Sequence, residues 1–318
     1  MEIREVRELA NALRSSIGRV IVGKDAVIDK VLAALLAGGH VLLEDVPGTG
    51  KTMMSGALAK SMDAQFARIQ FTPDLLPGDV TGMSVFNPKT AEFHFKPGPV
   101  FANVVLADEI NRATPRAQSS MLECMEEKQV SSDGVTYALP QPFFVIATQN
   151  PVETQGTFPL PEAQLDRFMV KLSMGYPTAA EQAAILSRFR AERPQDELTP
   201  VASAQQILEA QKAVQYVRVQ EDLLEYIGAI CEKTRQLDDV LLGASPRAAL
   251  ALMRVSQAYA AMNGRDYVVP ADIKEMAECV LAHRMILRTA YGQHGRAAQA
   301  VKEVLASVPV PTEKIENR

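Results

Sequence analysis

Short apolar runs alternate with helical patterns over roughly the first half of the chain. Five of these runs are bounded by turn signals and are hydrophobic at consecutive positions rather than at every second one. Such runs are typical of strands that are covered on both faces, as in a parallel sheet. They are HVLLE (40–44), FARI (66–69), NVVLA (103–107), FFVIAT (143–148) and FMVKLS (168–173). We therefore predict an α/β fold with a parallel five-stranded sheet.

One of the intervening helices is predicted to begin after Thr114. Thr114 can act as the N-cap, and Pro115 suits the first helical position. Apolar residues then follow at helical spacing, at positions 117, 121, 122 and 125.

Two segments interrupt the alternation of strands and helices. The first, about 72–100, is rich in proline and glycine and holds TGMSVF and AEFHF on either side of NPKT, which predicts a hairpin. The second, about 128–140, contains Asp133-Gly134, a pair that favours a tight hairpin turn. Long loops in a compact domain are usually functional or disordered.

Strand patterns stop after Tyr176-Pro177, and helical periodicity dominates the remainder of the chain. Helices are expected over 179–191, 203–213, 220–236, 246–262, 270–287 and 294–306. A polar linker is expected at 193–200 and a tail from residue 307. We therefore predict an α/β domain at 1–177 and an all-α domain at 178–318.

Composition narrows the class of protein. The chain has 318 residues, 47% of them hydrophobic and 22% charged, with a net charge of −5. It has no run of five or six Lys or Arg, so nucleic acid is not an expected partner. Its most apolar segment, 31–43, is too short to cross a bilayer, and no secretory signal pattern is present, so no membrane insertion is expected. Cys124, Cys231 and Cys279 are widely spaced, which favours neither disulfides nor a zinc site and suits the cytoplasm.

The stretch EDVPGTGKT, residues 44–52, is nearly a phosphate-binding loop of the pattern G-x-x-x-x-G-K-[ST]. It follows an apolar strand and precedes a helical pattern, as such a loop requires. Its glycines can turn backbone N–H groups toward phosphates at a helix N-terminus. Lys51 would then reach the β- and γ-phosphates of a nucleotide, and the Thr52 hydroxyl would bind Mg²⁺. The expected nucleotide contacts are Pro47, Gly48, Thr49, Gly50, Lys51, Thr52 and Met53.

Asp45 stands where the pattern has its first glycine. Asp tolerates turn conformations better than most residues, so it can replace the turn that glycine supplies. A working loop then requires the Asp45 carboxylate to point away from the phosphates. If it points toward them, nucleotide binding is weakened.

Two further strand ends carry polar residues that complete this chemistry. VVLADE (104–109) is an apolar strand that ends in Asp108, which is placed to hold Mg²⁺, and Glu109, which is placed to activate water. Asn150 follows the next strand, where its amide could position that water. Taken alone, Asn150 before Pro151 would be read as a turn residue.

Together these motifs resemble those of the AAA+ ATPases, and more narrowly those of the MoxR family. The resemblance runs from about residue 5 to 305. It rests on EDVPGTGKT, ADEINRATPRAQSSMLECMEE, ATQNP, TFPLPEAQLDRF and SPRA. That family commonly lacks glycine at position 45, which favours a working loop. The resemblance implies a P-loop core followed by a helical lid, with the 72–100 segment as an insert in helix 2.

The resemblance also assigns roles to individual residues. Val22 and Gly23 fall where the family packs adenine, and Asn150 corresponds to sensor 1. Arg247 corresponds to sensor 2, although it could act in cis or in trans, or be merely a first-turn helix residue. Arg167 corresponds to the arginine finger, which is supplied to the ATP of a neighbouring subunit.

Alternatives to the Arg167 assignment remain open. The side chain could simply form an ion pair with Glu162 or Asp166. Arg112 and Arg116 are rival candidates for a role across a subunit boundary.

By resemblance the protein hydrolyses ATP, forms a homo-oligomeric ring, expected to be a hexamer, and remodels protein complexes as a chaperone does. Partners with a von Willebrand factor A domain are common in the family. Phe86, Phe93 and Phe95 of the first hairpin could dock a client or merely cover the core. Two alternatives are a DNA-translocating motor and a nucleotide-binding scaffold without turnover. The DNA motor is disfavoured because the only Lys or Arg residues of the two hairpin segments are Lys89 and Lys96 in segment 72–100 and Lys128 in the second hairpin. A GTPase is disfavoured because no N-K-x-D segment follows the core strands.

Overall fold

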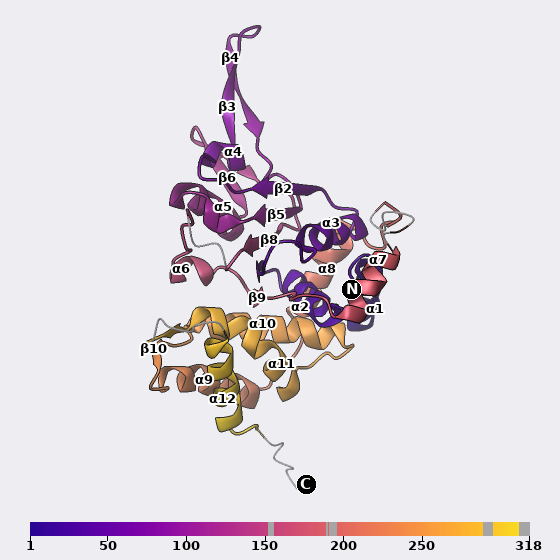
Figure 1. The fold of residues 1–318 in the computed structure, drawn as a ribbon, viewed down its shortest axis with the longest axis vertical. Coiled ribbons are helices and arrows are strands. Elements are labelled where there is room, and N and C mark those ends of the chain that lie inside the picture. The colour runs from indigo at the N-terminus through magenta and orange to yellow at the C-terminus, as the bar shows by residue number, and fades with distance from the viewer. Residues whose placement is uncertain (152–155, 189, 191–195, 289–294, 312–318) are drawn as a thin grey trace.

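The computed structural model describes residues 1–151, 156–188, 190, 196–288 and 295–311. The linker expected at 193–200 and the tail expected from residue 307 lie partly outside these ranges. Figure 1 shows the arrangement of the elements: a sheet in the middle, the helices of the last third of the chain below it, and a hairpin that projects above it.

The central sheet contains five parallel strands in the order β2-β5-β8-β1-β9. The strands are β1 (Val41–Glu44), β2 (Phe66–Gln70), β5 (Val104–Asp108), β8 (Phe144–Gln149) and β9 (Val170–Leu172). Each overlaps one of the apolar runs, so the predicted five-stranded parallel sheet is confirmed. Because the strands are parallel, their carboxyl ends share one edge of the sheet.

Apolar layers cover both faces of the sheet, which explains the continuous hydrophobicity of its strands. Along β5, Val104 and Leu106 point into one buried cluster, and Val105 and Ala107 point into the other. The first cluster holds the N-terminal helices α1 (Ile3–Gly18) and α2 (Asp25–Leu36) together with α3 (Lys51–Ser61) and the lid helices. The second holds α5 (Pro115–Glu127).

The start of α5 is as predicted. Thr114 is the N-cap residue with extended backbone, and Pro115 takes the first helical position. The apolar residues at 117, 121, 122 and 125 are all buried. The helix therefore presents its apolar stripe to the sheet, while its last turn reaches the surface at Glu126.

Both predicted hairpins are present. In the first, β3 (Gly82–Asn87) pairs with β4 (Glu92–Pro97) and extends away from the body after the short helix α4 (Pro77–Thr81) (Figure 1). In the second, β6 (Gln129–Ser132) pairs with β7 (Val135–Ala138).

Glycines and an aspartate set the turns and the close contacts of these hairpins. Asp133 and Gly134 both have positive φ, as a two-residue turn requires. At the base of the first hairpin, a Cβ on Gly98 would lie 2.4 Å from the Val80 carbonyl oxygen, and one on Gly82 would lie 2.4 Å from the Lys96 carbonyl oxygen. These two positions therefore need glycine.

The second half of the chain is helical, with two differences from the expectation. The helices are α7 (Ala179–Arg188), α8 (Ala204–Val214), α9 (Glu221–Arg235), α10 (Pro246–Met262), α11 (Pro270–Leu281) and α12 (Arg296–Ser307). The helix expected over 270–287 ends at Leu281 and continues as the 3₁₀ turn η2 (Ala282–Arg284). Strands also do not stop at 177, because β10 (Val240–Leu242) pairs with β11 (Ile286–Leu287).

The core and the helical domain share one apolar cluster. Helix α10 packs against α1 and α2, and α8 packs against α2. The Ser16 and Ser61 hydroxyls, from α1 and α3, lie 2.8 Å apart in the same interior. The domain boundary at residue 177 stays a prediction. Among the described residues, we find no helix with the length and hydrophobicity needed to span a bilayer.

Candidate active site

The glycine-rich loop connects the end of β1 to the first turn of α3. Gly48 and Gly50 have φ of 83° and 91°, a conformation that favours glycine. A Cβ at Gly48 would meet nothing within 4 Å, so the loop is open on that side. Helix α3 begins at Lys51, which places its unpaired N–H groups and positive dipole end beside the loop. This local structure matches the phosphate-binding loop predicted from the sequence.

The Asp45 carboxylate points away from the loop and into the protein. Its Oδ1 accepts hydrogen bonds from the Ser173 hydroxyl (2.8 Å) and the Gly175 N–H (3.0 Å), and its Oδ2 accepts one from the Met174 N–H (2.6 Å). Asp45 is not among the described residues with positive φ, so the expectation that Asp replaces glycine by tolerating the turn is wrong. Asp45 instead anchors the loop to the segment after β9.

Replacing Asp45 with Gly is therefore expected to loosen the loop rather than to relieve repulsion of phosphate. The change leaves the buried N–H of Met174 and the partly buried N–H of Gly175 without their acceptor. Since hydrogen bonds to charged groups are worth about 1.5–3 kcal/mol each, we expect the free energy of unfolding to fall by about 2 kcal/mol or more. Chemical denaturation measures this loss, and ATP titration should show no gain in affinity.

Ser173→Ala is the matched control for Asp45→Gly. It removes one of the three hydrogen bonds and leaves both N–H groups paired, so its loss of stability should be smaller. Tighter ATP binding by Asp45→Gly without a loss of stability would show that the carboxylate opposes the phosphates.

Lys51 lies at the loop with its ammonium group turned back toward the backbone. Its Nζ donates a hydrogen bond to the Asp45 carbonyl oxygen at 2.8 Å. Burial lowers the pKa of Lys51, while the carboxylates of Asp45, Asp108 and Glu109 act in the opposite direction. Thr52, the next residue of α3, is exposed. The lysine and the hydroxyl predicted to bind phosphate and Mg²⁺ thus lie at the same helix end.

Asp108 is buried at the carboxyl end of β5, where two neighbouring strands supply its partners. From β2, Arg68 donates to its Oδ2 through Nη2 (2.6 Å) and Nε (3.1 Å). From β8, the Thr148 hydroxyl donates to its Oδ1 (2.7 Å). The carboxylate predicted to hold Mg²⁺ is therefore paired with a half-exposed arginine.

Glu109 is held in a strained backbone conformation beside Asp108. It has φ 56° and ψ 48°, a region that costs a non-glycine residue about 1–3 kcal/mol and is concentrated at functional sites. Its N–H donates to the Thr148 hydroxyl (2.8 Å), and its Oε2 accepts from Gln70 (2.9 Å) and Arg112 (3.1 Å). One threonine hydroxyl thus orders both acids.

Asn150 is buried directly after β8. In the sheet, β8 lies between β5, which ends in Asp108, and β1, which leads into the phosphate loop. The strand order therefore places Asn150 between the two acids and the loop. Sequence spacing alone could not establish this adjacency, because β5, β8 and β1 are far apart along the chain.

Gly23, which follows Val22, lies against α7. Gly23 has φ 70°, and a Cβ there would lie 1.8 Å from the Glu181 carboxylate oxygen. Lys24 donates to the Tyr176 carbonyl oxygen (3.2 Å), which ties this segment to the chain before α7. The segment predicted to pack adenine is thus bounded by α7.

Arg167 and Arg247 meet at one carboxylate that the sequence analysis did not identify. Glu126, in the last turn of α5, forms two ion pairs: its Oε1 lies 2.5 Å from Arg247 Nη2, and its Oε2 lies 3.2 Å from Arg167 Nη2. The alternative pairing of Arg167 with Asp166 is not seen, since Asp166 binds Arg284 (2.6 Å). Arg167 follows α6 (Glu162–Leu165), and Arg247 follows β10. In Figure 1, α6 and β10 lie on the left, whereas α3 lies on the right.

Several residues of this site escaped sequence reasoning. Arg68 and Gln70 are polar at alternate positions of FARIQ, which was a usable signal for one face of an edge strand. Thr148, Glu126 and Arg284 carry no such signal. Their importance follows from their neighbours in space.

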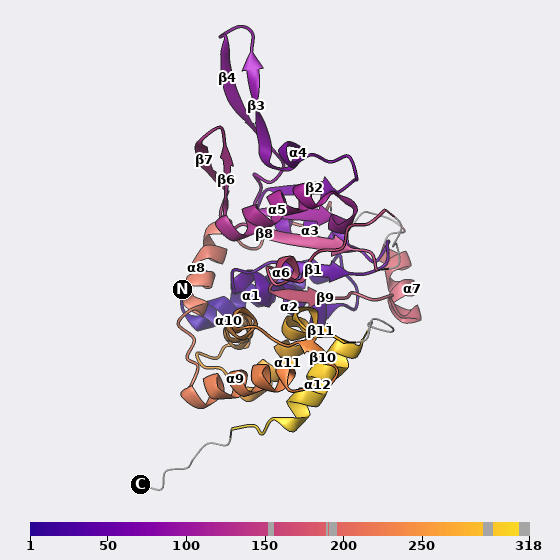
Figure 2. The same ribbon diagram turned by 90° about the vertical axis from the view of Figure 1, so that its left-hand side faces the viewer.

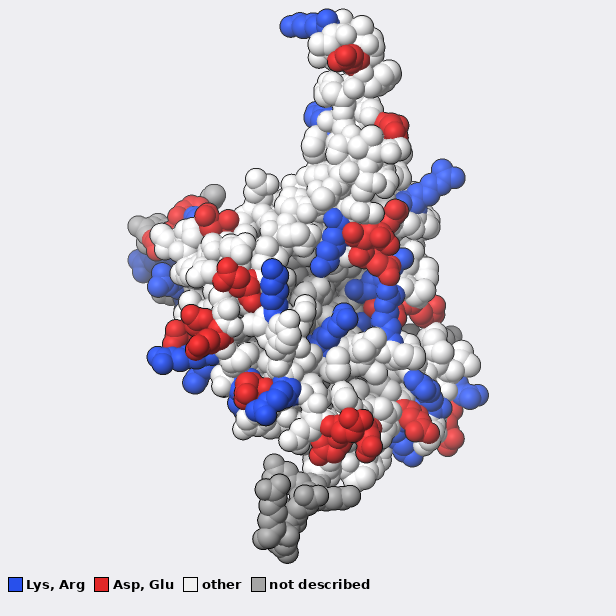
Figure 3. Space-filling model, turned by 180° about the vertical axis from the view of Figure 1, so that it is seen from behind, with Lys and Arg blue, Asp and Glu red and all other residues white. Residues whose placement is uncertain are grey.

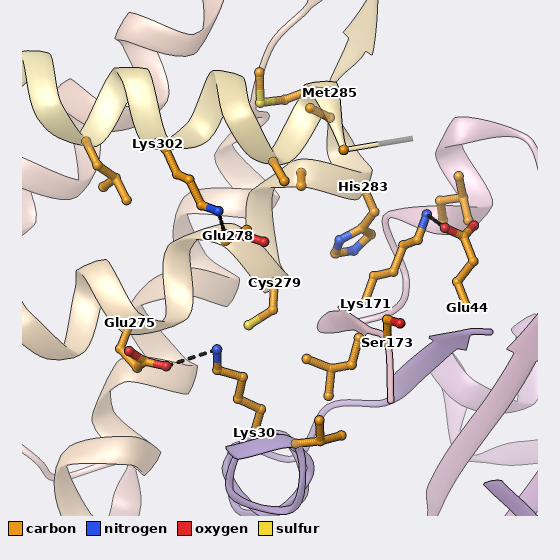
Figure 4. Close-up of a pocket in the computed structure, with 18 of the residues that line it drawn as sticks. Lys30, Glu44, Lys171, Ser173, Glu275, Glu278, Cys279, His283, Met285 and Lys302 are labelled. Carbon is orange, nitrogen blue, oxygen red and sulfur yellow. Dashed lines mark ion pairs between the residues drawn. The ribbon is translucent and has the colours of Figure 1, made fainter. Parts of the chain in front are cut away.

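A separate cavity of about 790 Å³ lies between α2, β9, α11 and α12 (Figure 4). Three of its four lysines are paired with acids: Lys30 with Glu275 (2.9 Å), Lys171 with Glu44 (2.7 Å) and Lys302 with Glu278 (3.3 Å). None of residues 45–52 lines it. It is therefore distinct from the phosphate loop.

Comparison with known proteins agrees with this geometry. Residues 40–170 match the ATPase family associated with various cellular activities (AAA), and residues 232–304 match the AAA lid domain. The chain is 54% identical over 299 residues to the uncharacterized protein YeaC of Bacillus subtilis, covering 94% of this chain and 93% of that protein.

Two further matches extend along almost the whole chain. The chain is 41% identical over 292 residues to Chaperone MoxR1 of Mycobacterium tuberculosis, covering 89% of this chain and 77% of that protein. A crystal structure from Cytophaga hutchinsonii matches with a TM-score of 0.89 and 40% identity, covering 98% of this chain and 97% of that one. The expected core with its helical lid is confirmed, and the chain belongs to the MoxR family of AAA+ ATPases.

Proposed function

We propose that this protein hydrolyses ATP to ADP and phosphate with Mg²⁺ and uses the reaction to remodel client proteins. One observation carries the proposal: the phosphate loop, Asp108, Glu109 and Asn150 are brought together at the carboxyl ends of adjacent strands. Phosphate release by the wild-type protein in Mg²⁺, compared with that by Lys51→Ala, tests it. Equal release by the two proteins would contradict it.

The residues present fit a magnesium nucleotide. The loop is open at Gly48, the Thr52 hydroxyl is exposed, and Asp108 supplies a carboxylate near the same helix end. Thr52 and Asp108 would hold Mg²⁺, which neutralises charge on the β- and γ-phosphate oxygens. Val22 and Gly23 would contact the adenine.

The remaining side chains divide the work of hydrolysis. Lys51 and the loop N–H groups bind the phosphates, and Asn150 orients the attacking water. Glu109 takes a proton from that water. At the same time the water oxygen bonds to the γ-phosphorus, and the bond between the γ-phosphorus and the β-phosphate oxygen breaks. Because Gln70 and Arg112 already contact the Glu109 carboxylate, its position is defined before substrate binds.

Arg167 and Arg247 are proposed to act in trans, within a homo-oligomeric ring of six subunits in the cytoplasm. Their separation from α3 in Figure 1 supports this, because α6 and β10 lie on the left of that view and α3 lies on the right. The name of the MoxR1 relative supports a chaperone role. A protein with a von Willebrand factor A domain is the proposed partner.

The alternatives are less well supported. A DNA motor would need several phosphate contacts on its hairpins. In the view of Figure 3, most of the surface of the projecting hairpin is uncharged. The two hairpin segments contain only three Lys or Arg residues, Lys89, Lys96 and Lys128. A scaffold without turnover would not need the strained, doubly held Glu109.

The projecting hairpin is proposed to contact the client through Phe86 and Phe93. These two residues are 50% and 73% exposed, and their ring centroids lie 5.3 Å apart. Phe95 differs from the expectation that it shares this role. It stacks on Tyr137 of the second hairpin at 4.1 Å and packs against Phe101 at 5.7 Å.

Replacing Phe86 and Phe93 with Ser should leave melting temperature and basal ATPase activity near wild type, because both rings face solvent. Stimulation of the ATPase by a client should fall. The control is Phe95→Ser, which should lower stability. It removes an aromatic stack that contributes about 0.5–1.5 kcal/mol in addition to the burial of its apolar area. A large loss of stability in the Phe86/Phe93 variant, with stimulation of the ATPase by a client retained, would show that these rings stabilise the fold and do not contact the client.

A further inference from the structure

Glu126 links the core to the lid at one point of the surface. It lies in the last turn of α5 in the core, while Arg247 lies in the first turn of α10 in the lid and Arg167 follows α6. Each of its two carboxylate oxygens binds a different guanidinium group, at 2.5 Å and 3.2 Å. Two cations from distant parts of the chain are therefore held side by side by a single acid.

The backbone beneath this pair is fixed by a buried arginine. Arg284 of η2 donates to the Asp166 carboxylate (2.6 Å) and to the carbonyl oxygens of Asp166 (3.1 Å), Phe168 (2.7 Å) and Met169 (3.0 Å). These acceptors flank Arg167 on both sides. The backbone at Arg167 is thus hydrogen-bonded on both sides to the lid, and Glu126 contacts its side chain.

Electrostatics explain why a shared acid is needed. Burial lowers the pKa of Arg284, Asp166 opposes that effect, and the nearby positive charge of Arg247 adds to it. Arg247 and Arg167 would likewise repel each other without an anion between them. Each pairs with Glu126 through one of its five N–H donors, so donors remain for another anion.

The two ion pairs contribute little to stability. The side chains of Arg167, Arg247 and Glu126 are 30%, 50% and 38% exposed, and ion pairs at such sites are typically worth about 0–1 kcal/mol. Removing Glu126 should therefore alter the positions of the arginines without unfolding the protein.

We infer that Glu126 is a positioning residue that holds Arg167 and Arg247 as one unit, so that both enter the nucleotide site of the neighbouring subunit together. The inference rests on the proposed ATPase function. Glu126 itself does not touch the reacting atoms. Its effect passes through the two arginines, and its loss lowers the rate of hydrolysis rather than the affinity for ATP.

Glu126→Gln tests the inference against Glu127→Gln. Glu127 is the next residue and is exposed, and its side chain forms no hydrogen bond or ion pair with the described residues. Misplacement of an oriented group by about 1 Å can cost roughly 10²-fold in rate. We expect a loss of that order in kcat for Glu126→Gln, with KM and melting temperature near wild type, and wild-type kinetics for Glu127→Gln.

Mixed rings show on which side of the interface the defect lies. Subunits with Glu126→Gln should be rescued by Lys51→Ala subunits, which keep intact arginines. They should not be rescued by Arg167→Ala subunits, whose defect lies on the same side. Glu126→Asp, which keeps the charge but shortens the reach, should fall between wild type and Glu126→Gln.

Three outcomes separate this inference from the proposed function. A wild-type kcat for Glu126→Gln, with Arg167→Ala inactive, overturns the positioning role alone. Faster hydrolysis by Glu126→Gln also overturns it, because the acid would then restrain the arginines. Equal phosphate release by wild type and Lys51→Ala overturns the proposed function itself.

Discussion

Glu109→Gln is expected to bind ATP and to hydrolyse it about 10²–10⁴-fold more slowly than wild type, the usual contribution of a general base. Glutamine keeps the size of the side chain and an oxygen that can accept from Gln70 or Arg112, so the site should keep its shape. It cannot accept the proton of the attacking water. Phosphate release measures the rate, and a fluorescent ATP analogue measures binding.

Lys51→Ala provides the complementary variant. The ammonium group lies at the loop and donates a hydrogen bond to the Asp45 carbonyl oxygen at 2.8 Å. Its removal should lower ATP affinity, whereas Glu109→Gln should not. Equal hydrolysis by wild type and Glu109→Gln would remove Glu109 from catalysis. The Glu109→Gln variant, held with ATP bound, is also suited to isolating the client.

Arg167→Ala is expected to lower hydrolysis by roughly 10³–10⁵-fold, the contribution of an arginine finger in related P-loop enzymes, and to leave ATP binding in place. The side chain contacts Glu126 rather than its own phosphate loop, so binding by the same subunit does not depend on it. Single-turnover hydrolysis and ATP titration measure the two effects.

Mixing Arg167→Ala subunits with Lys51→Ala subunits supplies the control. A hybrid interface can pair an intact loop with an intact arginine, so part of the activity should return. No rescue among subunits shown to mix would exclude Arg167 as the finger. Arg116, which is exposed, would then be the next candidate, since Arg112 already binds Glu109 of its own chain.

Local sequence was sufficient to predict most of the fold and the types of residue at the site. The five strands could be recognised because strands buried on both faces are continuous apolar runs. Both hairpins could be recognised because Asp133-Gly134 and a Pro- and Gly-rich segment are typical of turns. Lys51, Asp108 and Glu109 could be named because a loop or a strand end positions each of them. These are effects within a few residues along the chain.

The end of the helix expected over 270–287 was not predictable in this way. Its periodicity continues past Leu281, but the buried Arg284 bonds to carbonyl oxygens of the core around Phe168, and β11 pairs with β10. Both partners are distant along the chain. Helical propensity therefore yields to contacts that exist only in the folded molecule.

The sequence by itself thus determined the five strands of the central sheet, the phosphate loop and the identity of its acids, because each depends on neighbours along the chain. Only the tertiary structure decided that the Asp45 carboxylate faces Ser173, that Phe95 is covered by Tyr137, and that Arg167 meets Arg247 at Glu126. The physical reason is that the orientation of a side chain depends on which hydrogen-bond donors, rings and charges surround it. Parallel strand order and lid packing bring those groups together from distant positions, and no local pattern records them.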